Sequence, residues 1–392
     1  MTSLVSRLKR RLFDFVTRPL VRRFPLQMAE VVSEELARLS GNPAQGLFAR
    51  HGFQLTRAEP SGAVPSSPGS GQIYDDRQAL AVAESLAGYL SRHDGTLAHG
   101  VFKRYGFHLL RKHFYLPIPD EIDIERPLAA EPSELVGVDM NDAAGLDLLN
   151  RVFPPYVREF RSRFPVHPRP DQAAHEFYLI NSSYMAVDAQ VYYALIREFK
   201  PRRIVEIGSG NSTLLAGASA LANRVETGQT TELIAIEPYP QEFLRQGVPG
   251  LSRLIEAKAQ DVDLNLFTSL QAGDILFIDS SHVLRAGGDV HLEYLEILPR
   301  LQPSVLVHIH DISLPKPYPR VYFDHLLYWN EQYLLQAFLA FNRRFDVIWP
   351  GNYMLLPYPD QVMAVFPELT VMREHYPMSE PSAFWLRVRP QS

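Results

Sequence analysis

The chain of 392 residues contains no cysteine, which excludes disulfide bonds, thiolate zinc sites and a cysteine nucleophile together. It has no apolar run long enough to span a bilayer. It also lacks a strong charge of either sign, because the formal net charge is −5. No nucleic-acid partner is therefore expected. The length allows one large or two modest cores, and we expect a globular, cytoplasmic protein.

The first 24 residues carry a different charge pattern, with seven lysines and arginines against the single acid Asp14. Their apolar residues fall on one helical face, which predicts a basic amphipathic helix. Charges recur throughout the segment, whereas a signal peptide needs an unbroken apolar core. We favour a helix that docks on its own domain or on a partner chain, such as another copy in a homo-oligomer. Peripheral contact with an anionic membrane surface through residues 1–24 is the less favoured alternative.

Residues 59–75 are rich in proline, glycine and serine, as is typical of a linker. Similar phrases lie on either side of it, Leu-Phe-Ala-Arg-His-Gly-Phe at 47–53 and Val-Phe-Lys-Arg-Tyr-Gly-Phe at 101–107. A duplicated helix end would leave such a trace, although two seven-residue matches are thin evidence for a repeat. The expected divisions are a helical region over 1–58, the linker over 59–75, a helical and then irregular region over 76–165, and a domain over 166–392.

From about residue 170 the pattern alternates between apolar strands and helices. Seven strands are expected, at 203–207, 232–237, 252–257, 274–279, 304–310, 345–349 and 383–388. Helices are expected between most of them, notably at 189–199, 289–298 and 326–341. This alternation predicts an α/β fold with a Rossmann-like, mostly parallel sheet that is covered on both faces. Ligands of such sheets bind beyond the carboxyl ends of the strands.

The most informative stretch is Ile204–Thr213, which reads as a buried strand, a glycine turn and the start of a helix. Gly208 and Gly210 allow a sharp turn and a close approach to a ligand. The helix that follows points its partly positive N-terminus at whatever lies on the glycines. A tight turn without a ligand is the alternative if the glycines are taken alone.

Two acids at strand ends favour one nucleotide cofactor over another. The sequence fingerprint of dinucleotide-binding sites has a third glycine where this chain has Thr213. Glu206 suits an ammonium-bearing amino acid better than a pyrophosphate, and Glu237 follows the next strand, where it can accept hydrogen bonds from ribose hydroxyls. Together they favour S-adenosylmethionine (SAM) over NAD.

A second group of polar side chains follows two later strands. Asp279 ends the strand at 274–279 and His282 comes three residues later, while His310 and Asp311 end the strand at 304–310. Two carboxylates and an imidazole at neighbouring strand tips can hold a divalent cation. An oxygen-dominated set suits Mg²⁺ or Mn²⁺, whereas a histidine ligand would favour other transition metals. A neutral imidazole can also act as a general base. The alternatives differ by residue: Asp311 could only cap a turn, and His310 could equally be structural. His308 points to the opposite face and is expected to be a core or supporting residue.

The segment Leu314–Phe323, stiffened by prolines and rich in aromatics, is expected to be a lid or substrate wall over this group, or else a rigid connection. Tyr178, Tyr184, Tyr318 and Tyr322 are aromatic residues that could stack on a sugar or a phenol.

Residues from about 175 to 388 resemble the class I SAM-dependent methyltransferases. The branch is the one that includes metal-dependent sugar O-methyltransferases of macrolide biosynthesis and cephalosporin-hydroxylase-like proteins. The resemblance lies in these segments: Val187–Ala189, Val205–Gly210, Ile278–His282, His308–Ile312, Trp329–Leu335 and Ser382–Arg387.

The resemblance implies a seven-stranded sheet with an antiparallel last strand and a cofactor on its first two strands. By position, the methionine half of SAM would face Glu206, Gly208, Gly210 and Asn211. The ribose would face Glu237, and the adenine would face Gln260 and Asp261. The resemblance also implies Asp279 and Asp311 as metal ligands, with His282 as the base. His310 stands where the sugar methyltransferases carry a glutamate, and we include it among the candidate ligands.

The expected function is methyl transfer from SAM to a hydroxyl of a sugar, glycan or polyol-like small molecule, assisted by Mg²⁺ or Mn²⁺. One alternative is a hydroxylase-like relative that keeps the fold and carries out different chemistry. Another is a non-catalytic SAM-binding adapter that is recruited by its basic N-terminal helix.

Overall fold

The computed structural model describes residues 53–57, 107–111, 115 and 117–390. It divides the chain into two units, Met1–Ile118 and Pro119–Ser392. The described part of the first unit contains strand β1 (Phe53–Arg57) and strand β2 (Phe107–Arg111), which pair antiparallel with Leu55 opposite Leu109. In the described residues no helix is both long and apolar enough to cross a membrane. The basic segment 1–24 and the linker 59–75 lie outside the described residues.

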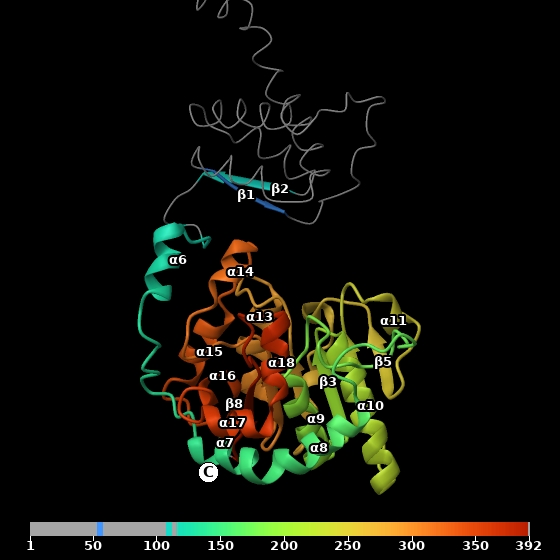
Figure 1. Cartoon of the computed structure of the whole chain (residues 1–392). Helices are drawn as coiled ribbons and strands as arrows, with labels where there is room; N and C mark the ends of the chain where they lie inside the picture. The colour runs from blue at the N-terminus through green and yellow to red at the C-terminus, as the bar shows by residue number, and fades with distance from the viewer. Residues whose placement is uncertain (1–52, 58–106, 112–114, 116, 391–392) are drawn as a thin grey trace, which may run out of the picture. The chain divides into compact units, whose positions relative to one another are not determined.

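The second unit is built on a seven-stranded sheet in the order β5-β4-β3-β6-β7-β9-β8 (Figure 1). Its strands are β3 (Arg203–Ile207), β4 (Glu232–Ile236), β5 (Leu251–Ile255), β6 (Ile275–Ile278), β7 (Leu306–Ile309), β8 (Phe345–Pro350) and β9 (Phe384–Val388). Strands β5, β4, β3, β6 and β7 run parallel, whereas β9 is antiparallel to both of its neighbours. The predicted fold class and all seven strands are confirmed.

Helices cover both faces of this sheet. They are α6 (Glu121–Leu128), α7 (Asp142–Asp147), α8 (Phe153–Arg163), α9 (Asp188–Phe199), α10 (Asn211–Thr227), α11 (Glu242–Arg245), α12 (Asn265–Thr268), α13 (Asp289–Leu292), α14 (Arg320–Asp324), α15 (Glu331–Leu339), α16 (Gly351–Met354), α17 (Pro359–Val365) and α18 (Glu368–His375). Short π and 3-10 turns add η1 (Leu148–Val152), η2 (Ala259–Asp261), η3 (Glu293–Ile297) and η4 (Leu298–Arg300).

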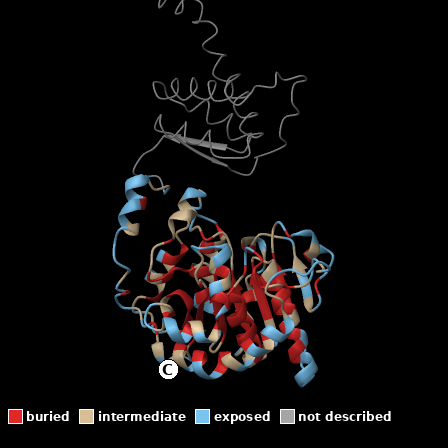
Figure 2. Ribbon diagram, in the orientation of Figure 1, coloured by how far each residue is buried: buried red, intermediate tan, exposed pale blue. Residues whose placement is uncertain are grey.

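Alternate residues of each central strand enter two separate cores. Ile204 and Phe277 pack with residues of α8, α9, α10, α17 and α18. Val205 and Ile278 pack with residues of α12, η3, η4 and α15 on the other face. Because successive side chains of a strand point to opposite faces, this alternation explains why the central strands are apolar throughout. Figure 2 shows the buried residues concentrated along the sheet and the inner sides of its helices.

Some expected boundaries differ from those in the structure. The second unit begins at Pro119 rather than at residue 166, because η1 and α8 place Leu149, Phe153 and Phe160 in the same core as the sheet. The stretch 289–298 is a succession of α13, η3 and the start of η4 instead of one helix, and the stretch 326–341 is helical only over α15. Phe53 and Phe107, the last residues of the two similar phrases, begin strands, while the other residues of both phrases lie outside the described residues.

Candidate active site

The glycine turn lies directly against the end of the neighbouring strand β6. Strand β3 ends at Ile207, which pairs with Ile236 and Ile278 of its neighbours. Gly208 follows with a φ of +83°, and a Cβ at this position would lie 1.8 Å from the carbonyl oxygen of Asp279. Only glycine fits both the left-handed backbone and this close approach. The contact brings the glycine turn and the acid at the end of β6 to one place.

The second glycine opens helix α10 and leaves free space. Gly210 is the residue before Asn211, the first of α10, and its extended φ of 174° does not demand glycine. A Cβ at Gly210 would meet no atom within 4 Å. The Gly210 N–H donates to the Thr213 hydroxyl at 3.2 Å, and Asn211 Nδ2 donates to Ser183 Oγ at 2.7 Å. These hydrogen bonds fix the turn, and they leave room for a ligand beside Gly210.

Glu206 is fully buried beneath this turn. Tyr192 donates to its Oε1 at 3.0 Å, and Thr213 donates to its Oε2 at 2.6 Å. Burial raises the pKa of Glu206 to about 7, although both hydroxyl donors favour the charged form. The carboxyl expected to face an ammonium group is therefore already held by two side chains of the protein.

Glu237 lies half-buried at the end of β4. Its Oε2 accepts from the Ser209 N–H at 3.3 Å and its Oε1 accepts from the Tyr239 N–H at 2.9 Å. The first of these bonds ties it to the glycine turn, as its predicted position at the strand end requires. Gln260 and Asp261 lie on η2, which follows β5, the strand next to β4.

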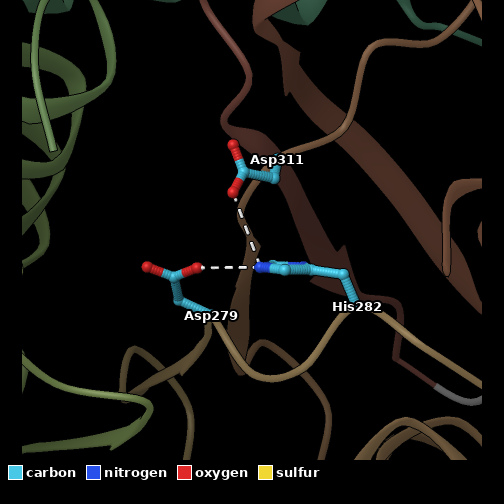
Figure 3. Close-up of side chains that lie close together, drawn as sticks. All are labelled: Asp279, His282 and Asp311. Carbon is cyan, nitrogen blue, oxygen red and sulfur yellow. Dashed lines mark ion pairs between the residues drawn. The ribbon is translucent and has the colours of Figure 1, made fainter. Parts of the chain in front are cut away.

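Three side chains from the ends of β6 and β7 point at one another (Figure 3). His282 Nε2 lies 3.2 Å from Asp279 Oδ1 and 3.5 Å from Asp311 Oδ2. One donor atom from each residue lies within 4.8 Å of the other two. His282 and Asp311 both have left-handed backbones, with φ of 58° and 56°. Non-glycine residues held in this region often belong to functional sites.

His310 lies beside this group and makes a second set of contacts. Its Nδ1 is 3.3 Å from Asp279 Oδ1 and 3.7 Å from Asp311 Oδ2. Its Nε2 is 3.5 Å from Asp188 Oδ2 and 3.4 Å from Ser382 Oγ. His310 thus bridges Asp279 to the buried Asp188, whose carboxylate also accepts hydrogen bonds from the Ser382 and Ala383 N–H groups just before β9.

The two imidazoles and the carboxylates shift one another's pKa values. Burial disfavours the charged forms, but it is outweighed in each case by an opposite charge nearby. Asp279 and Glu331 raise the pKa of His282 well above its ordinary value. Asp311 and Asp279 do the same for His310. In return, His310 and His282 hold the pKa of Asp279 well below its usual range.

His308 belongs to the core, as expected. It is fully buried, its ring stacks on Phe277 with centroids 4.2 Å apart, and its Nε2 lies 3.3 Å from the Tyr184 hydroxyl. Burial lowers its pKa well below the ordinary value for histidine, and the neighbouring His310 adds to the effect.

The aromatic segment after β7 divides into a fixed part and a part that faces the site. Tyr318 is buried, and its hydroxyl accepts from the Gln332 N–H at 3.2 Å. Tyr322 of α14 is half-buried, with its hydroxyl 3.5 Å from Asp311 Oδ1. Its ring lies 4.6 Å from that of Trp329, which in turn lies 4.4 Å from the His282 ring. Tyr322 and Trp329 therefore form an aromatic wall beside the three-residue group.

Sequence reasoning missed three supporting residues. Glu331, the first residue of α15, accepts from His282 Nδ1. Thr213 was noted only as a missing glycine, and Asp188 and Glu331 only as parts of a resemblance. An acid at the first turn of a helix commonly stabilises the helix end, so neither Glu331 nor Asp188 carried a signal of its contact with a distant histidine.

Comparison with known proteins agrees with this geometry. Residues 205–312, which span the glycine turn through both strand-end acids, match a family model described as a methyltransferase domain. An uncharacterised protein of Archaeoglobus fulgidus is 34% identical over 166 residues, which cover 41% of this chain and 72% of that protein.

The chain belongs to the family of this archaeal protein and contains a class I methyltransferase domain. A solved structure of the plantazolicin methyltransferase BpumL in complex with SAH covers 64% of this chain and 99% of that chain. Its sequence identity is 14% and its TM-score 0.26, a level of likeness that adds nothing to the argument.

Proposed function

We propose that the protein transfers a methyl group from SAM to a hydroxyl of a sugar, glycan or polyol-like acceptor, assisted by a divalent cation. The observation that carries the proposal is the contact between Gly208 and Asp279. It joins a turn suited to a nucleotide cofactor with a buried histidine between two carboxylates. A methyl donor on the turn and a hydroxyl at the histidine would then be neighbours.

The residues around the glycine turn fit one face of SAM. Gly210 leaves open space at the start of α10, where partial positive charge and free N–H groups gather. Glu237 presents a half-buried carboxylate beside that space and is already ordered by the Ser209 N–H. When bound, SAM would supply an electrophilic methyl group. The protein's part is to hold donor and acceptor in line.

The carboxylates of Asp279 and Asp311 fit a divalent cation, with His310 beside them as a further candidate ligand. An oxygen of each carboxylate lies within 4.8 Å of one of the other, and oxygen-rich sets suit Mg²⁺ or Mn²⁺. The two aspartate side chains are 30% and 20% exposed, so the group can be reached from solvent. A cation there would supply positive charge that orients a hydroxyl and lowers its pKa.

His282 is proposed as the general base. Its Nε2 faces both carboxylates, while its Nδ1 is engaged by Glu331. Nε2, the nitrogen that would take up the proton, is therefore directed at the place where Asp279 and Asp311 meet. Both carboxylates raise the pKa of His282 in the protein alone, and a cation bound to them would lower that pKa so that Nε2 can act as an acceptor. Trp329 and Tyr322 close this place on one side and offer flat apolar surface to a ring-shaped acceptor.

The proposal is tested by calorimetric titration of the full chain with S-adenosylhomocysteine (SAH), with and without Mg²⁺ or Mn²⁺. We expect micromolar binding that falls at least about tenfold in Glu237→Ala, since this change removes the proposed ribose partner. Glu242→Ala, an exposed acid on α11, serves as the control. Labelled SAM offered with mixed sugars and polyols then identifies the acceptor.

Two outcomes would overturn the proposal. Absence of SAH binding under every metal condition would make the glycine turn purely structural. Binding without transfer to any hydroxyl, together with oxidation of an acceptor, would instead identify the hydroxylase-like alternative.

A further inference from the structure

The segment Trp329–Glu331 touches His282 at its backbone, its ring face and its ring nitrogen. The His282 carbonyl accepts from the Asn330 N–H at 3.0 Å and from the Glu331 N–H at 3.2 Å. Asn330 Oδ1 also accepts from the Leu284 N–H at 2.6 Å, just beyond the histidine. Trp329 packs on the imidazole ring. These contacts hold a non-glycine residue in the left-handed conformation, which is otherwise costly.

Glu331 keeps a proton on Nδ1 of His282, whether or not Nε2 is also protonated. Its side chain is fully buried, and both oxygens are used. Oε2 lies 2.9 Å from His282 Nδ1, and Oε1 accepts from the Tyr294 hydroxyl at 3.0 Å. A carboxylate only accepts hydrogen bonds, so Nδ1 must donate, and Nε2 is left to face Asp279 and Asp311.

We infer that Glu331, anchored by Tyr294, is the positioning residue of His282 and keeps Nε2 directed at the methyl acceptor. The inference rests on the proposed function for its catalytic meaning, while its structural content is independent of SAM. The same device in other sites fixes the tautomer and orientation of a working histidine, whether that histidine moves a proton or binds a metal.

The Glu331→Gln variant gives a sharp test. Tyr294 would still donate to the amide oxygen, which turns the amide nitrogen towards His282 Nδ1. An amide nitrogen can only donate, so the proton must leave Nδ1. In Tyr294→Phe/Glu331→Gln the amide is free to turn, and its oxygen can again accept from Nδ1. Proton occupancy is read from ¹⁵N spectra of the histidine-labelled full chain, with His282→Gln identifying the resonance.

We expect Nδ1 of His282 to be protonated in the wild type, unprotonated in the single variant and protonated again in the double variant. Glu293→Gln is the matched control, because Glu293 is also fully buried but contacts Ser280 instead of His282. An unprotonated Nδ1 in the wild type refutes the inference without any variant. Loss of the Nδ1 proton in Glu293→Gln also refutes it. SAH titration of the same samples tests the proposed function separately.

A second observation concerns the first unit and is independent of the site. Without gaps, residues 28–57 align with residues 82–111 at an offset of 54, and thirteen of the thirty positions are identical. The identical pairs are Ala29/Ala83, Glu30/Glu84, Leu36/Leu90, Arg38/Arg92, Gly41/Gly95, Ala44/Ala98, Gly46/Gly100, Phe48/Phe102, Arg50/Arg104, Gly52/Gly106, Phe53/Phe107, Leu55/Leu109 and Arg57/Arg111. The two short phrases are therefore parts of a longer repeat.

The register of β1 and β2 matches the symmetry of this repeat. Phe53 lies opposite Arg111, and Arg57 lies opposite Phe107. Phe107 is the repeat equivalent of Phe53 and Arg111 that of Arg57, so exchanging the two repeats converts one pair into the other. The pair Leu55 and Leu109 is converted into itself. Among the registers open to two five-residue strands, this is the one with a two-fold axis through equivalent residues.

The geometry points to an internal dimer, in which the two repeats of one chain pair with each other. They are joined through β1 and β2 and related by a pseudo-two-fold axis. The stretch 59–75 then links two copies of one unit instead of separating different domains. Homodimers built on a shared sheet use the same self-complementary pairing.

The absence of cysteine makes cross-linking a clean test in the full chain. Two pairs of substitutions are equivalent under the two-fold, namely Gln54→Cys with Leu110→Cys and Thr56→Cys with His108→Cys. We expect both to form disulfides within one chain at similar rates. Arg57→Cys with Arg111→Cys is the control. These residues are equivalent in the repeat, but Arg57 lies opposite Phe107, four residues from Arg111, so their Cα atoms are about 13 Å apart, too far for a disulfide. Rates that differ more than about tenfold between the equivalent pairs, equal reaction of the control, or bonds formed only between chains would each overturn the assignment.

Discussion

The hydroxyl of Thr213 lies 2.6 Å from Oε2 of Glu206 and also accepts from the Gly210 N–H. Threonine at this position links the buried acid beneath the turn to the turn itself, a role that a third glycine could not fill. Glu206 is the group whose titration should be visible in the stability of the fold, since burial raises its pKa from an ordinary 4.5 to about 7.

The free energy of unfolding should change with pH in the way that the raised pKa of Glu206 predicts. Below about pH 4.5 folded and unfolded chains both hold the proton, and no stability is lost. Between pH 4.5 and 7 only the unfolded chain releases it, so the free energy of unfolding falls, by roughly 3 kcal/mol in total. Glu206→Gln removes this loss. Denaturant unfolding should therefore show the variant gaining about 2 kcal/mol relative to wild type between pH 5 and pH 8.

Glu242→Gln is the control for this experiment, because Glu242 is exposed on α11 and its replacement should leave the difference from wild type flat with pH. A flat difference for Glu206→Gln as well would mean that Glu206 is ionised in the folded protein throughout this range.

The two glycines of the turn should respond differently to alanine. In Gly208→Ala the new Cβ would overlap the Asp279 carbonyl in a left-handed backbone, which should cost about 2–3 kcal/mol and displace the end of β6. Gly210→Ala meets no protein atom within 4 Å and should fold with wild-type stability. SAH titration of Gly210→Ala then asks whether that space belongs to the cofactor, and unchanged affinity would place the cofactor elsewhere.

The sequence predicted the sheet well because each central strand is a short apolar run between polar turns. It also placed Asp279 and Asp311 at neighbouring strand ends, where the structure finds them 3.2 and 3.5 Å from His282. Parallel strands gather their carboxyl ends at one edge, so the order of strands alone brings these residues together.

The contacts that hold the site residues in place could not be predicted in the same way. Glu331 reaches His282 across 49 residues, and its position depends on how α15 packs against the sheet. Asp188 reaches Ser382 across 194 residues. Such contacts depend on side-chain packing in three dimensions and leave no periodic trace in the chain. The boundary at Pro119 was missed for a related reason, since α8 joins the core through the aromatic contacts of Phe153.

Phe153→Ala should destabilise the second unit strongly. The ring is fully buried, 4.8 Å from that of Trp349 and 5.6 Å from that of Phe366. Truncation leaves a cavity in a packed core, which typically costs about 3–5 kcal/mol. Denaturant unfolding measures the loss, with Val225→Ala as the control because Val225 is 90% exposed. A loss below about 1 kcal/mol would show that α8 contributes little to this core.

The Mn²⁺ affinity of variants should distinguish the residues that bind the cation from the residue that acts as the general base. Asp279→Asn and Asp311→Asn each remove a charged oxygen from the candidate site, and we expect Mn²⁺ affinity to fall at least about tenfold, since even supporting partners of metal ligands cost 10–100-fold. His282→Gln should keep Mn²⁺ affinity within about threefold while methyl transfer falls about 10²–10⁴-fold, the usual contribution of a general base. Electron paramagnetic resonance of free Mn²⁺ measures the affinity in the full chain.

His310→Gln belongs in the same series because His310 lies 3.3 Å from Asp279 and 3.7 Å from Asp311. A fall in Mn²⁺ affinity equal to that of Asp311→Asn would make it a ligand, in the place where the sugar methyltransferases carry a glutamate. His325→Gln is the control, since His325 is exposed and ends α14. If His282→Gln weakens Mn²⁺ binding as much as Asp279→Asn does, the imidazole is itself a ligand. The proton of the acceptor must then leave through another group.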